Sequence, residues 1–144
     1  MKISIKHGIQ LVGLPLVLSS GKSESVCFLI DTGATHNVLF DFVYEHLKDE
    51  VKPIEGSQQI MGIEGDCKKV HLVEATFDFD GYACTSTFAV MNVSKAVQQM
   101  QDETGIQIHG ILGIQFLLVN KCILDFNRLQ ISISDGTNIH ITSS

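Results

Sequence analysis

The sequence is poor in several residue types that mark specialised proteins. It has no tryptophan and only two prolines, and charged residues make up 18% of its 144 positions, against 44% for apolar residues. A chain of this composition buries enough apolar surface to fold, so a disordered protein is excluded. Its length suits one hydrophobic core, and we expect a single domain over residues 1–144.

Positive charge and long apolar runs are also scarce. The formal net charge is −6, and Lys68-Lys69 is the only adjacent basic pair. Because nucleic-acid binding needs clustered lysine and arginine to neutralise phosphates, we expect no nucleic-acid partner. The apolar run Leu11–Leu18 is short and contains Gly13 and Pro15. It suits neither a signal peptide nor a membrane span, so we expect a cytoplasmic protein that does not contact a membrane.

The cysteine and histidine spacing predicts no metal site. None of the four cysteines, Cys27, Cys67, Cys84 and Cys122, belongs to a Cys-x-x-Cys pair, which disfavours a zinc knuckle or a thioredoxin-like site. Two disulfides are possible, but the apolar neighbours of Cys27 and Cys122 favour buried free thiols and a reducing compartment. The six histidines are scattered. We therefore expect neither a metal nor an organic cofactor.

Short apolar segments bounded by turns predict an all-β protein. The segment Cys67–Phe79 alternates apolar and polar residues, and Asp80-Gly81 is a strong signal for a tight hairpin turn. Strands are predicted at Ile3–Leu18 (one or two strands), Val26–Ile30, Asn37–Phe40, Ser57–Met61, Cys67–Phe79, Thr85–Val93, Ile106–Leu112, Lys121–Phe126, Leu129–Ser134 and Asn138–Thr142. Short helices are predicted at Asp41–Lys48, Ser94–Thr104 and Ile114–Val119. Asp41 lies near the N-cap of the first helix, and Pro53 closes that region. Ser94 is the N-cap of the second helix, and Gly105 ends it. This pattern predicts a closed barrel with two or three short helices.

One stretch organises the chain chemically. Phe28–Ile30 reads as a buried strand that delivers Asp31 to a turn of small residues, Thr32 and Gly33, and the apolar pair Val38-Leu39 follows. An isolated Asp-Thr-Gly is most often a surface turn. Apolar runs on both sides instead predict a carboxylate at a strand end where water is scarce, and such a group needs a function.

These residues resemble a known family. Leu29–Thr35, with Val38-Leu39 behind it, is similar to the active-site loop of retropepsin-type aspartic proteases. The family's second signature, two apolar residues and a glycine before a short helix, is similar to Gly110–Leu118, and its glycine-bearing flap resembles Gln59–Gly65. The three landmarks stand in the family's order and span about Pro15 to Ile133.

The resemblance implies a role for each matching residue. Asp31 is the expected catalytic carboxylate, Thr32 is expected to bond across a dimer, and Gly33 and Ala34 are expected to line the site. Two groups of residues complete the expected site: the loop support Ile111, Leu112 and Gly113, and the flap Met61, Gly62, Ile63, Glu64 and Gly65. The expected substrate is an extended peptide held between the flap and the floor of the site. His36 either reaches the site or caps the turn.

A single carboxylate cannot perform the expected reaction. Peptide hydrolysis needs a base for the water and an acid for the leaving nitrogen, and the two aspartates of aspartic proteases share one proton for this purpose. Asp135-Gly136-Thr137 reads as a hairpin turn, and Asp125 reads as a strand-end residue before a turn at Asn127-Arg128, so only Asp31 is usable. We therefore predict a homodimer that brings Asp31 to Asp31 of a second copy.

Two other functions fit the same residues. The first is a catalytically silent member of the fold that serves as a peptide-binding or dimerisation module. The second is a monomeric β-barrel that binds a small ligand, which leaves the pairing of Asp31 with Ile111-Leu112-Gly113 unexplained. The preferred interpretation is an aspartic endopeptidase.

Overall fold

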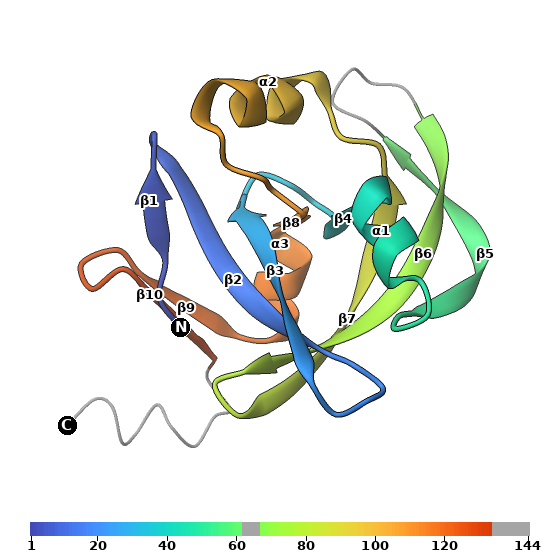
Figure 1. Cartoon of the computed structure of the whole chain (residues 1–144), viewed down its shortest axis with the longest axis horizontal. Coiled ribbons are helices and arrows are strands. Elements are labelled where there is room, and N and C mark those ends of the chain that lie inside the picture. Colours follow the sequence, from blue (N-terminus) through green and yellow to red (C-terminus); the bar gives the residue numbers. More distant parts are fainter. Residues whose placement is uncertain (62–66, 134–144) are drawn as a thin grey trace.

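The computed structural model describes residues 1–61 and 67–133 of the chain, which are mostly β-structure (Figure 1). The strands are β1 (Ser4–Lys6), β2 (Ile9–Val17), β3 (Ser23–Ile30), β4 (Val38–Phe40), β5 (Lys52–Met61), β6 (Cys67–Phe79), β7 (Tyr82–Met91), β8 (Gly110–Leu112), β9 (Cys122–Asp125) and β10 (Gln130–Ile133). The helices are α1 (Asp41–Leu47), α2 (Lys95–Thr104) and α3 (Ile114–Val119).

The main sheet closes on itself. Its strand order is β1-β2-β3-β8-β4-β7-β6-β5, and a further pairing of β2 with β6, at Leu16 and Phe77, joins the ring β2-β3-β8-β4-β7-β6. The pairs β3–β8 and β4–β7 are parallel. Strands β1 and β5 extend the sheet beyond the ring. The predicted closed barrel with short helices is therefore confirmed.

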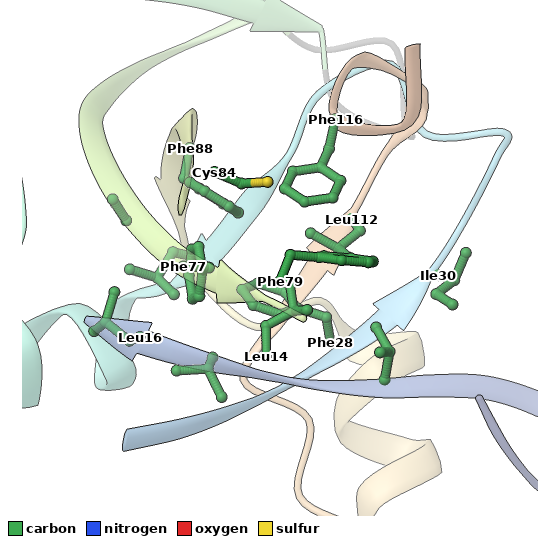
Figure 2. Packing of buried hydrophobic residues seen from close by; sticks show 14 of the residues in the cluster. Leu14, Leu16, Phe28, Ile30, Phe77, Phe79, Cys84, Phe88, Leu112 and Phe116 are labelled. Carbon is green, nitrogen blue, oxygen red and sulfur yellow. The ribbon is translucent and has the colours of Figure 1, made fainter. Parts of the chain in front are cut away.

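The barrel interior is apolar because alternate residues of each strand point inward. In β3, the inward residues Val26, Phe28 and Ile30 are buried in the main core cluster. Phe28 lies 5.5 Å from Phe77 and 5.6 Å from Phe88 between ring centroids, and Figure 2 shows these rings among the aliphatic side chains of the interior. This aromatic centre fixes β3, the strand that carries Asp31 at its end.

A second apolar cluster lies on the outside of the barrel. Its buried members are Leu11, Val38, Phe40, Val97 and Ile108. Three of them project from strands, and Val97 belongs to α2, so helix and barrel share this cluster. Figure 1 shows α2 over the end of the barrel at which β3 stops. Among the described residues, no helix is long and apolar enough to cross a membrane.

Local turn and cap signals in the sequence held. Asp80 and Gly81 both have positive φ, at 52° and 92°, as a tight two-residue hairpin turn requires. The Ser94 hydroxyl accepts a hydrogen bond from Val97 N–H at the start of α2, and Gly105 ends the helix with a φ of 72°.

Other boundaries differ from the prediction. Strand β8 begins at Gly110 rather than Ile106, because the preceding backbone bonds elsewhere: Ile108 N–H donates to the Gln101 side chain at 2.7 Å. Pro53 lies inside β5 instead of closing the region, which is tolerated because β5 is an edge strand. Helix α1 starts at Asp41, directly after its N-cap Phe40, so the prediction that Asp41 lies near the N-cap is confirmed.

The C-terminal strands were expected to complete the barrel sheet, and this was wrong. Strands β9 and β10 form a separate two-stranded sheet, with residues 2 and 3 on the far side of β10. Asp125 is the last residue of β9 and accepts hydrogen bonds from Asn127 and Arg128 N–H, both at 3.0 Å, so it ends a strand before a turn, as predicted. The predicted strand Asn138–Thr142 and the predicted turn at 135–137 lie outside the described residues.

Cysteine side chains Cys27, Cys84 and Cys122 are free thiols, as predicted for the first and last of them. Burial raises the pKa of Cys122 to about 12, and the neighbouring Cys84 adds to the shift. The thiol therefore stays protonated at neutral pH.

Candidate active site

Asp31 lies at the end of β3, where the strand is tied to β8. Its N–H donates to the Leu112 carbonyl at 3.0 Å, which extends the parallel β3–β8 pairing by one residue. Because Ile30 points into the barrel, Asp31 belongs to the outer face. Asp31, Thr32 and Gly33 are all exposed in the single chain. The expectation of a water-poor carboxylate is therefore wrong for one copy of the chain.

The loop fixes the carboxylate by hydrogen bonds to its own backbone. Gly33 N–H donates to Oδ1 of Asp31 at 3.0 Å, and Ala34 N–H donates to the Asp31 carbonyl at 3.1 Å. A Cβ at Gly33 would stand 3.3 Å from Oδ1, tighter than most real contacts. Within the described residues, Oδ2 has no hydrogen-bond partner. One carboxylate oxygen is thus held and the other is available.

Residues of the second signature support this loop from below. Ile114 N–H donates to the Ala34 carbonyl at 2.8 Å. A Cβ at Gly113 would lie 2.6 Å from the His36 carbonyl oxygen and 2.7 Å from that of Ala34, so only glycine fits between the loop and α3. Leu112 is fully buried in the core, while Ile111 is half-buried in the outer cluster.

Asn37 connects three elements, and sequence reasoning missed it. Its side chain is 2% exposed, and its Oδ1 accepts hydrogen bonds from Gly113 N–H at 3.0 Å and Phe116 N–H at 3.2 Å. Its Nδ2 donates to the Thr87 carbonyl at 3.2 Å, and Ala89 N–H donates to its backbone carbonyl. The amide thereby satisfies orphan N–H groups at the start of α3 and joins the loop to β7. A polar residue directly before the buried run Val38–Phe40 was the available signal.

The other expected site residues are only partly placed. Met61 lies at the end of β5, while Gly62, Ile63, Glu64 and Gly65 fall outside the described residues. Thr32 is exposed beside Asp31. In the described part of the chain, no group of three or more His, Cys, Asp and Glu side chains is arranged to hold a metal ion.

Comparison with known families identifies the chain. The aspartyl protease family matches residues 17–116, which include the Asp31 loop and the support at Gly113. The chain belongs to the aspartyl protease family. No curated protein matches the sequence.

Solved structures show the same fold. The retroviral protease-like domain of Ddi1 from Leishmania major is 12% identical, with a TM-score of 0.57, and the match covers 87% of this chain and 89% of that one. EIAV protease in complex with the inhibitor HBY-793 is 19% identical, with a TM-score of 0.53, over 80% of this chain and 92% of that one. The retropepsin-like fold is therefore shown, at identities too low to carry an activity.

A pocket of about 270 Å³ borders the end of the loop, at His36 and Asn37. Ile54, Leu72 and Ala89 supply apolar lining, and His36 and Gln115 supply polar side chains. His36 thus lines this pocket, and Asp31 is not among the lining residues. None of the lining residues carries a formal charge when His36 is neutral, so the pocket suits an uncharged side chain.

His109 lies in the segment that leads into β8, beside Cys27 of β3. Its Nδ1 accepts a hydrogen bond from Cys27 N–H at 2.8 Å, so this nitrogen carries no proton. Burial lowers the pKa of His109, and the nearby Glu24 carboxylate opposes the shift. A neutral, clamped imidazole at this position acts as a structural bridge between β3 and β8.

Proposed function

We propose that this chain is a dimeric aspartic endopeptidase in which two Asp31 carboxylates activate one water. The observation that carries the proposal is the Asp31 loop. It is fixed to β8 and α3, it exposes its carboxylate on the outer face, and it leaves Oδ2 without a partner among the described residues. A second copy supplies what is missing, because a two-fold axis at the loop pairs Asp31 with itself.

The pair acts through one shared proton. Two carboxylates at short range cannot both ionise comfortably, so one is the base that takes a proton from water and the other is the acid. The acid donates to the leaving nitrogen of the peptide, and the pair titrates as a unit. Thr32 bonds across the dimer, and Gly33 and Ala34 let the peptide backbone approach.

The substrate is an extended polypeptide. We expect its backbone to pair with the floor at Asp31 and with the predicted flap, Met61 to Gly65, since strand addition supplies binding energy without sequence preference. One side chain enters the pocket lined by His36 and Gln115. We expect it to be uncharged and of moderate size.

Exposed apolar side chains indicate where the second copy docks. Leu118 and Val119, at the end of α3, are 69% and 67% exposed, and Ile123 and Phe126 follow in and after β9. Within the described residues, β9 pairs with β10 along one edge only. An open strand edge beside apolar side chains invites a partner strand. Since α3 directly follows the loop support at Gly113, a second copy docked here also approaches Asp31.

A peptide-library assay with matched variants tests the activity. Asp31→Asn is expected to abolish hydrolysis, while Asp49→Asn, at an exposed position away from the site, is expected to retain it. Hydrolysis that survives Asp31→Asn would contradict the proposal. Failure of the wild-type chain to cleave any peptide as a dimer would favour the silent binding module.

A sedimentation experiment tests the docking surface. Val119→Glu should weaken the dimer about 10-fold or more, because it removes an apolar contact and places a charge in the interface. Val17→Glu makes the same change at an exposed position of β2 and should leave the dimer intact. Equal dimerisation of the two variants would show that the interface lies elsewhere.

A further inference from the structure

Helix α2 shares the outer face of the barrel with Asp31. Along β3 the inward residues are Phe28 and Ile30, so Leu29 and Asp31 project from the opposite face. Ile111 of β8 pairs with Leu29 of β3, and Val38 of β4 pairs with Ile111. These three apolar side chains form a strip that begins beside the carboxylate, and we call it the Asp31 strip.

The Asp31 strip belongs to the cluster that α2 covers. Outer-face residues of a barrel are ordinarily wet, yet Val38 is buried and Leu29 and Ile111 are half-buried. The same cluster contains Val97 and Met100 of α2 and Ile106 and Ile108 of the segment that follows. The helix and its flanks therefore exclude water from apolar surface next to the proposed active site (Figure 1).

Attachment of α2 is local and slight. Val97 is the only buried residue of the helix. Within the described part of the chain, the hydrogen bonds of α2 all end inside residues 94–108, and none reaches a barrel strand. Gly105, with its left-handed φ of 72°, separates the helix from His109, which is bonded to β3 and to Phe40. The helix can leave the barrel without breaking a sheet hydrogen bond.

We infer that α2 is an autoinhibitory cover that competes with the substrate for the Asp31 strip. This inference rests on the proposed peptidase function, because it assumes that an extended peptide lies over Asp31. Apolar side chains of that peptide displace α2, and the helix returns when the product leaves. Elements with few buried contacts open locally at low cost, which suits such a role.

Two substitutions in α2 change the open fraction of the cover in known directions, and a third serves as their control. Val97→Ser removes most of the apolar docking contact and should raise the open fraction about 10-fold or more. Ala96→Ser lowers helix propensity on the exposed face without touching the cluster, and is the matched control. Lys95→Glu replaces a cation in the first turn by an anion, so it should stabilise the helix and lower the open fraction about two- to five-fold.

The decisive measurement uses the Asp31→Asn background, in which the peptide is not consumed. A blocked heptapeptide of valine, leucine and phenylalanine between terminal lysines is titrated, and amide hydrogen exchange is followed in residues 98–104. Binding should tighten about 10-fold with Val97→Ser, weaken with Lys95→Glu and change by no more than about two-fold with Ala96→Ser. Saturating peptide should speed exchange in α2.

Outcomes for the cover and for the peptidase are separable. Slower exchange in α2 on peptide binding, equal affinity of Val97→Ser and Ala96→Ser, or no binding to any of the variants would each overturn the cover. Peptide binding with the expected α2 exchange, together with no Asp31-dependent hydrolysis by the wild-type chain, would retain the cover and refute only the peptidase.

Discussion

Replacing Asn37 by alanine tests whether one buried amide holds the candidate site together. The substitution removes two hydrogen bonds that Oδ1 accepts and one that Nδ2 donates, and it strands Gly113 N–H, Phe116 N–H and the Thr87 carbonyl. Both N–H bonds are buried, and an unsatisfied buried group costs about 1–3 kcal/mol. If water reaches one of the three groups, the expected loss of unfolding free energy is about 3–5 kcal/mol.

Equilibrium denaturation in urea measures this loss. Asn92→Ala, at an exposed position after β7, makes the same chemical change without buried partners and should shift stability by no more than about 0.5 kcal/mol. A loss below about 1 kcal/mol for Asn37→Ala would refute the reasoning, since it would mean that the N-terminal amides of α3 find other partners. Peptidase activity should fall more than the folded fraction does, because the loop at Asp31 loses its tie to β7.

Three further predictions follow from the geometry of the loop and the buried titratable groups. Gly113→Ala should destabilise the fold by about 2–4 kcal/mol in a denaturant titration, because the new Cβ meets the Ala34 carbonyl oxygen at 2.7 Å. Burial raises the pKa of Cys122 from the ordinary thiol value of 9.0 to about 12, so the folded state holds a proton that the unfolded state loses. Stability should therefore fall by up to about 1.4 kcal/mol per pH unit above pH 9, a slope that Cys122→Ala should reduce. The lowered pKa of His109 has the opposite consequence: the unfolded state binds the proton more readily, so stability should fall as pH drops below about 6.5, and an imidazole NMR titration should place the folded pKa below the usual value.

The sequence predicted those parts of the site that depend on near neighbours. Asp31 follows an apolar strand, and Gly113 follows the apolar pair Ile111-Leu112, so strand, loop and helix start could all be placed from local pattern. The closed barrel followed from many short alternating strands. Turn and cap residues such as Gly105 act within a few positions, and their predictions held.

Features that depend on distant partners were missed. The bonds of Asn37 reach residues 50 to 79 positions away, so the residues near it in the chain do not identify its partners. The start of β8, at Gly110, was predicted wrongly because Ile108 N–H donates to the side chain of Gln101 instead of to a strand. Apolar alternation in β9 and β10 predicted strands correctly, but it could not say that they would form their own sheet.

The alternation of β3 also explains why this chain exposes its catalytic candidate. A strand that buries Phe28 and Ile30 must turn the next side chain outward, so the barrel cannot hold Asp31 inside without breaking its own core. The water-poor environment that carboxylate chemistry needs must then come from outside the barrel. In the proposed dimer a second copy covers Asp31 along the two-fold axis, and α2 covers the apolar strip beside it. The fold thus supplies the position of the carboxylate, and its surroundings are assembled only when partner and substrate arrive.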